Sequence, residues 1–89
     1  MVLSLLKAAL GISSAVRDEY LQAIIDSVLT ELRDVNGMVF DLTRPDHLLF
    51  VVDLAEWRYR GRGTTQPMPP HLRTRYLDFW VSLGGQPDG

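Results

Sequence analysis

The fold of this chain is decided by residues 53–75, which read DLAEWRYRGRGTTQPMPPHLRTR. An apolar segment ends there in alternating aromatic residues and arginines, and it stops at Gly61 and Gly63. A proline-rich segment follows, and Pro69-Pro70 then opens a second amphipathic pattern. Glycine commonly ends helices, whereas proline is tolerated in their first turn. The stretch therefore predicts a helix, a loop and a second helix.

The same stretch holds most of the positive charge. Five of the nine basic residues lie in it, and all five are arginines. Residues 1–56 carry four basic and nine acidic residues, a net charge of −5. Residues 57–89 carry five basic and two acidic residues, a net charge of +3. The formal net charge of −2 therefore conceals an acidic part and a basic part.

The chain is short for a domain that folds alone. Its 89 residues predict one domain, residues 1–89, with a loose tail at about residues 85–89. A domain of this size buries only about 60–65% of the surface that the unfolded chain exposes. The absence of cysteine excludes disulfides and thiolate metal ligands. Partner subunits are then the most available source of further burial.

Composition separates the chain from disordered and membrane proteins. With 46% hydrophobic and 22% charged residues, it is too apolar to be disordered. No segment approaches the ~20 apolar residues of a membrane helix. The apolar opening is interrupted by Lys7 and follows no basic segment, which argues against a secretory signal. We expect no membrane partner.

Apolar periodicity predicts an all-α bundle of about four helices, at residues 3–10, 15–35, 45–59 and 70–83. Gly11 is expected to stop the first helix. Ser13 or Ser14 is expected to cap the second, and Asn36-Gly37 to end it. The second helix has the clearest apolar stripe, whose members recur three or four residues apart. They are Leu21, Ile24, Ile25, Val28, Leu32 and Val35.

The third and fourth predicted helices differ in how much of their surface is apolar. The third is apolar nearly all round, which is typical of a helix buried on most sides. Its polar strip includes Glu56 and Arg60, which are spaced for an i,i+4 ion pair. The fourth carries a narrower stripe, formed by Leu72, Tyr76, Phe79, Trp80 and Leu83.

Residues 38–42, Met-Val-Phe-Asp-Leu, alternate weakly between the two sides of an extended chain. One interpretation is a short strand, which would need a pairing partner, for example in another subunit. The other is a tether whose Met38, Phe40 and Leu42 pin it to the core. The sequence leaves both open.

Patterns typical of metal sites and enzymes are missing from this sequence. The two histidines, His47 and His71, have no metal-binding spacing. The Gly-Arg-Gly of residues 61–63 follows a helix and lacks the Lys-Ser/Thr of a phosphate loop. Asp53 and Glu56 share a helix face, but we interpret them as a solvated or inter-subunit strip rather than an acid pair. We predict no enzymatic activity, no metal and no cofactor.

The aromatic and arginine cluster at residues 57–62 allows three interpretations. Its aromatics can pack in the core while its arginines are solvated. Its arginines can contact phosphates while its aromatics stack on bases. It can also form a protein interface, and the acidic part of the chain favours this, because a basic edge can meet the acidic face of a neighbouring copy. The candidates in the arginine-rich part are Trp57, Arg58, Arg60, Arg62, Arg73 and Arg75, and the acidic candidates are Asp26, Asp53 and Glu56.

The order of these motifs resembles the small head–tail connector (adaptor, or head completion) proteins of long-tailed bacteriophages. The resemblance runs from about residue 5 to residue 83 and is one of pattern and order. It rests on LKAALGI at residues 6–12, DEYLQAII at 18–25, AEWRYRGRG at 55–63 and the Met-Pro-Pro of residues 68–70. None of these segments is a catalytic signature.

The resemblance implies a helical, cofactor-free subunit of the virion neck, assembled in the host cytoplasm. Such subunits form a ring below the portal protein, extend the DNA channel and dock the stopper or tail. Twelve copies are expected from the family, because portals have twelve-fold symmetry, and DNA would pass close to the ring. Some relatives dock the portal through a longer C-terminal extension, whereas only residues 84–89 follow the last predicted helix here. The alternative is a small helical nucleic-acid-binding protein that uses the arginine-rich segment 58–75.

Overall fold

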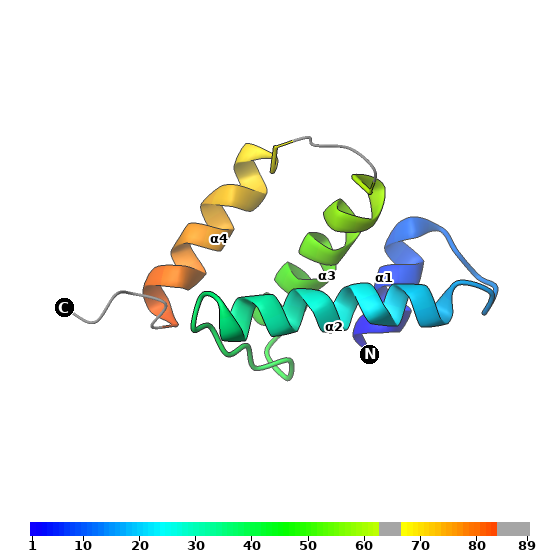
Figure 1. Ribbon diagram of the computed structural model, residues 1–89, viewed down its shortest axis with the longest axis horizontal. Helices are drawn as coiled ribbons and strands as arrows, with labels where there is room; N and C mark the ends of the chain where they lie inside the picture. The colour runs from blue at the N-terminus through cyan, green and yellow to red at the C-terminus, as the bar shows by residue number, and fades with distance from the viewer. Residues whose placement is uncertain (63–66, 84–89) are drawn as a thin grey trace.

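The computed structural model describes residues 1–62 and 67–83, and this part of the chain contains four α-helices and no strand (Figure 1). The helices are α1 (Val2–Leu10), α2 (Asp18–Asp34), α3 (Pro45–Arg60) and α4 (Pro70–Ser82). The predicted all-α class is therefore confirmed. The expected stop at Gly63 and the expected tail at residues 85–89 lie outside the described residues.

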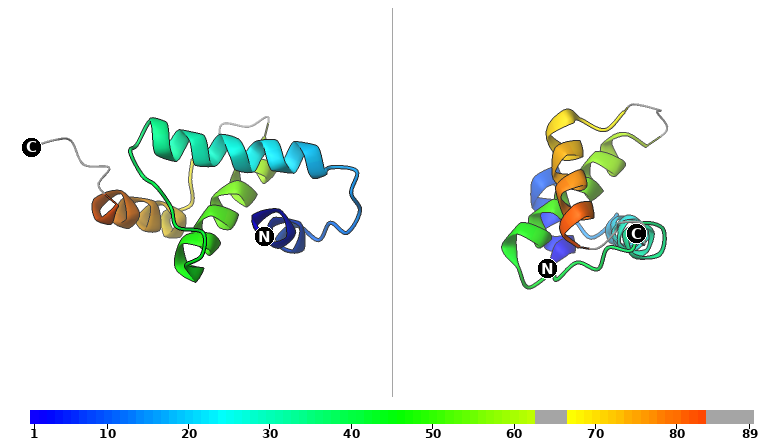
Figure 2. Two further views of the ribbon diagram at one scale, coloured as in Figure 1. Left: turned by 90° about the horizontal axis from the view of Figure 1, so that it is seen from below. Right: turned by 90° about the vertical axis from the view of Figure 1, so that its left-hand side faces the viewer.

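Helix α3 is the centre of the bundle, because it packs against each of the other three helices. Helices α1 and α2 also contact each other, whereas α4 packs against α3 alone among the helices. Seen from below, α1, α3 and α4 all lie on one side of α2 (Figure 2). One long face of α2 is therefore turned away from the rest of the molecule.

The end of α2 differs from its prediction in one side chain. Gly37 has a positive φ of 68°, as expected for a glycine that ends a helix. The Gly37 N–H donates to the Arg33 carbonyl (3.1 Å) and the Met38 N–H to the Leu32 carbonyl (2.8 Å). This Schellman-type turn brings Met38 into the core and leaves Val35 exposed. The assignment of Val35 to the buried stripe was therefore wrong.

The start of α2 also differs, because the helix begins at Asp18 rather than near residue 15. Arg17 occupies the N-cap position and no side chain caps the helix, so the predicted capping by Ser13 or Ser14 was wrong. The Asp18 carboxylate instead pairs with Lys7 of α1, with 2.8 Å between Nζ and Oδ1. This contact between helices holds the first turn of α2 at its start.

Residues 38–42 form the tether rather than a strand. The Phe40 ring lies 5.2–5.5 Å, centroid to centroid, from the rings of His47, Phe50 and Phe79. The Asp41 N–H donates to Nδ1 of the buried His47 (2.9 Å). The Asp41 carboxylate accepts hydrogen bonds from the Thr43 hydroxyl (2.6 Å) and N–H (3.0 Å), and these bonds lower the pKa of Asp41. The tether therefore leads directly into the start of α3.

Helix α4 is attached to the core through one face. Leu72 is buried, and the other members of its predicted stripe are partly buried against the core. Asn36, just after α2, donates a hydrogen bond to the Tyr76 hydroxyl at 2.5 Å. Partial burial raises the pKa of this hydroxyl above its ordinary value. On the other sides of α4, Leu77 and Val81 are exposed.

None of the four described helices combines the length and the hydropathy that crossing a membrane requires.

Candidate functional site

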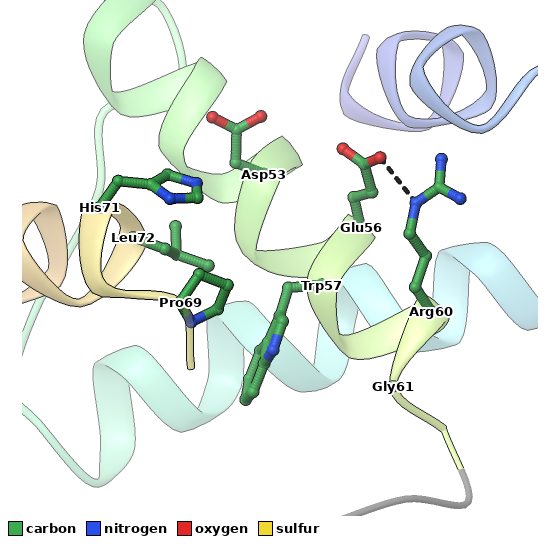
Figure 3. Close-up of a pocket in the computed structure, with 8 residues that line it drawn as sticks. All are labelled: Asp53, Glu56, Trp57, Arg60, Gly61, Pro69, His71 and Leu72. Atoms are coloured by element: carbon green, nitrogen blue, oxygen red, sulfur yellow. Dashed lines mark hydrogen bonds and ion pairs between the residues drawn. The ribbon is translucent and has the colours of Figure 1, made fainter. Parts of the chain in front are cut away.

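Four of the nine candidate residues line one hollow between α3 and the start of α4 (Figure 3). Asp53, Glu56, Trp57 and Arg60 share a side of α3, because their spacing of 3, 4 and 7 residues matches the helical repeat. The hollow has a volume of about 430 Å³. Its lining is completed by Gly61, Pro69, His71 and Leu72.

Three of the candidate arginines are paired within their own chain. Arg60 Nε lies 2.8 Å from Glu56 Oε2, as the i,i+4 spacing predicted (Figure 3). Arg58 Nη1 lies 2.8 Å from Oε2 of Glu31 and joins α3 to α2. Arg58 and Arg60 therefore each have a carboxylate partner within their own chain.

The third of these arginines connects α4 to α3. Arg75 Nη1 lies 2.6 Å from Asp53 Oδ2. The guanidinium carbon of Arg75 is also 5.3 Å from the centroid of the Phe50 ring. The pair is partly shielded from water, since about a third of the Arg75 side chain and under half of the Asp53 side chain are exposed. It therefore adds a polar contact to a helix boundary where Phe50 of α3 also packs against Tyr76 and Phe79 of α4.

The remaining candidates are not part of the hollow. Arg62 is exposed, and its Nη1 donates to the Tyr59 carbonyl at 2.6 Å. Arg73 is exposed on α4 and has no carboxylate partner in the described part of the chain. Asp26 is exposed on α2 and accepts a hydrogen bond from Gln22 at 2.9 Å. The structure thus separates the nine candidates into several surfaces.

The two carboxylates that line the hollow are both engaged in ion pairs. Asp53 and Glu56 each pair with an arginine and not with each other. Among residues 1–62 and 67–83, no three His, Asp or Glu side chains are placed to hold a metal ion. The half-buried indole of Trp57 beside paired charges is the kind of surface that binds protein side chains.

Sequence reasoning missed Arg17. This residue is the N-cap of α2, and its guanidinium donates a hydrogen bond to the hydroxyl of Tyr59, 42 residues further along the chain. A signal was available, since a cation is unfavourable at the positive end of a helix dipole and calls for another explanation. The partner of Arg17 could not be inferred, because helical periodicity does not show that Tyr59, near the end of α3, lies close to the start of α2.

We expect the Asp53–Arg75 pair to couple α4 to α3 energetically. Asp53→Asn and Arg75→Gln should each lower the free energy of unfolding by up to about 1 kcal/mol, and a double-mutant cycle should give a coupling of about 0.5–1 kcal/mol. Urea denaturation followed by circular dichroism measures both. The exposed neighbours Arg33 and Asp34, 2.9 Å apart on α2, provide a control pair that should show no measurable coupling. Equal coupling in the two pairs would contradict this prediction.

No family model, no curated protein and no solved structure matches this chain.

Proposed function

We propose that this chain is a structural subunit of a bacteriophage virion, a head–tail connector that forms a ring below the portal. Such a ring extends the DNA channel and docks the stopper or tail. The proposal is supported by the ordered motifs between about residue 5 and residue 83 and by a four-helix architecture of the expected class. It places the protein in the virion neck, and in the host cytoplasm during assembly.

The observation that carries the proposal is a row of exposed side chains along one side of α4. Arg73, Leu77 and Val81 follow one another at intervals of four residues and therefore share a side of the helix. Leu77 is 49% exposed and Val81 is 58% exposed. We call these three residues the α4 outer stripe. Exposed apolar side chains next to an arginine that has no carboxylate partner among the described residues are typical of a surface that another protein covers.

A matching surface lies on the side of α2 that faces away from the other helices (Figure 2). Glu19 and Asp26 are exposed there two turns apart, and neither pairs with a cation in the described residues. Ala23 lies between Glu19 and Asp26, and Ser27 follows Asp26. Because both side chains are small, a helix of another copy can approach this side of α2 closely. We call these four residues the α2 outer face.

The two surfaces belong to different copies. The α2 outer face points away from α4 of the same chain (Figure 2). The α4 outer stripe therefore cannot contact the α2 outer face within one molecule. A contact between two different surfaces is head-to-tail, and it closes into a ring when the rotation between copies permits. Arg73 of one copy would then meet Asp26 of the next, which retains two of the predicted interface residues.

A charge exchange tests this contact. Arg73→Glu and Asp26→Arg should each raise the concentration needed for assembly about threefold to fivefold per contact, as expected for a partly exposed ion pair. The double variant should recover the wild-type value, because the pair is restored with its signs exchanged. Light scattering measures the mass from micromolar concentrations upward, with and without a portal ring. The melting temperature should change little, since both side chains are exposed.

The same measurement tests the function itself. A large closed oligomer, or a monomer that joins the portal in stoichiometric amount, supports the connector. Single variants that assemble like the wild type would place the contact elsewhere on the surface. A monomer that ignores the portal but is retained by DNA at low salt would overturn the connector function in favour of nucleic-acid binding.

A further inference from the structure

Two arginines that are distant in the sequence are held by one buried tyrosine. The guanidinium of Arg17 donates to the hydroxyl of Tyr59. The guanidinium carbon of Arg62 lies 4.0 Å from the centroid of the Tyr59 ring, and Arg62 Nη1 donates to the Tyr59 carbonyl. Tyr59 is buried in the core, so its ring and hydroxyl hold the two guanidinium groups in place. We call Arg17 and Arg62 the Tyr59 arginine pair.

Neither member of this pair has a carboxylate partner among the described residues. Most other cations have one, with nitrogen–oxygen distances of 2.6–3.1 Å. Those paired cations are Lys7, Arg33, Arg44, Arg58, Arg60 and Arg75. The third cation without such a partner, Arg73, is on α4. Two of the three described arginines without a carboxylate partner therefore contact the same residue, Tyr59.

Local electrostatics make this position favourable for an anion. Arg17 is the N-cap of α2, and the N-terminal end of a helix carries a positive partial charge. The first turn also holds two carboxylates: Asp18 is paired with Lys7, and Glu19 is exposed on the outer side of α2. Two guanidinium groups on one tyrosine also repel each other, and a bound anion would relieve this repulsion.

An open hollow of about 580 Å³ is lined by Arg17, Tyr59 and Arg60, whereas Arg62 lies outside its lining, on the Tyr59 ring. Ser13 and Ser14 also line it, and their hydroxyls are neutral hydrogen-bond donors. Arginine and serine side chains are common donors to the phosphate groups of nucleic acids. We propose that the Tyr59 arginine pair, together with this hollow, binds the phosphodiester backbone of nucleic acid without reading its sequence.

A polyanion fits the pair better than a single carboxylate does. Successive phosphates can neutralise both arginines at once, whereas one carboxylate can fully compensate only one of them. With a net charge of −2, the rest of the chain adds little attraction, so one copy binds DNA weakly. The site lies within a single copy and does not depend on ring assembly, and a weak backbone contact would let DNA slide past a connector.

Fluorescence anisotropy with a labelled 20-base-pair duplex, at low and at rising salt, tests the site. Arg17→Gln/Arg62→Gln should weaken binding about tenfold or more at low salt. It should also reduce the slope of log affinity against log salt by about 1.8, because each phosphate contact contributes about 0.9. Tyr59→Phe keeps both charges and the ring but releases Arg17, so it should give intermediate affinity. Circular dichroism checks that each variant is folded.

A matched control removes the same charge elsewhere. Arg33→Gln/Arg44→Gln deletes two exposed arginines that pair with Asp34 and Asp46, and this variant should bind DNA like the wild type. Equal weakening in both double variants, or no wild-type binding at low salt, would overturn the proposal. Unchanged DNA binding with altered mass in light scattering would assign the pair to a contact between copies instead. If the wild-type protein binds DNA but forms no ring, the connector function is contradicted, whereas the DNA-binding site at Tyr59 is not.

Discussion

Phe50→Ala is expected to lower the free energy of unfolding by about 3–5 kcal/mol, the usual cost of truncating a buried phenylalanine. Phe50 is 0% exposed, in the middle of the central helix. Its ring centroid lies 5.5 Å from that of Phe40 and 4.9 Å from that of Phe79. One side chain therefore joins α3, the tether and α4, and its loss affects all three contacts.

The expected loss is large compared with the total. Small domains are stable by about 0.05–0.15 kcal/mol per residue, so this chain has on the order of 4–13 kcal/mol. At the lower end of this range the loss is enough to leave the variant partly or wholly unfolded. Chemical denaturation followed by circular dichroism measures the change. Leu49→Ala is the matched control, because Leu49 is the preceding residue of α3 but is 50% exposed, and we expect a cost below about 1 kcal/mol. Similar costs for both variants would mean that Phe50 is not the centre of the core.

Leu77→Asp is expected to weaken assembly strongly without loss of the fold. Leu77 lies in the middle of the α4 outer stripe, between Arg73 and Val81. If a neighbouring copy covers the stripe, an aspartate there must bury an unpaired carboxylate, which is strongly unfavourable. We expect the concentration needed for assembly to rise by more than about tenfold, which corresponds to about 1.4 kcal/mol. Light scattering measures the mass, and thermal unfolding should stay within a few degrees of the wild type.

Val39→Asp is the control for this prediction. It makes an equivalent apolar-to-acidic change at an exposed residue outside the stripe, in the tether. We expect this variant to assemble normally. If Val39→Asp prevents assembly as well, added negative charge rather than the stripe is responsible. If Leu77→Asp assembles like the wild type, the stripe is not the contact between copies.

The helices could be predicted from the sequence because their signals are local. Apolar spacing places the side chains of α2 and α4 that face the core, and Gly11 and Gly37 both adopt the positive φ expected of glycines that end helices. The Glu56–Arg60 pair was also predictable, since both residues lie on one turn of one helix. Each of these features depends on residues at most a few positions apart.

The candidate site could be predicted only in part. Residue types identified the arginine-rich segment, and four candidates do share a hollow. The partners of the arginines could not be predicted, because Arg58 pairs across 27 positions and Arg75 across 22. Such pairings depend on how the helices cross, and helical periodicity contains no information about crossing.

The sequence by itself determined the all-α class, the approximate helix ranges and the sides of the helices that are buried, because these follow from a repeat of 3.6 residues and from glycine and proline chemistry. Only the tertiary structure decided where α2 begins, why Met38 rather than Val35 lies in the core, and which arginines find a carboxylate among residues 1–62 and 67–83. Those outcomes are set by contacts between elements, such as Lys7 with Asp18 and Arg17 with Tyr59. A side chain reaches such a partner only after the apolar faces have packed and fixed the distances between helices.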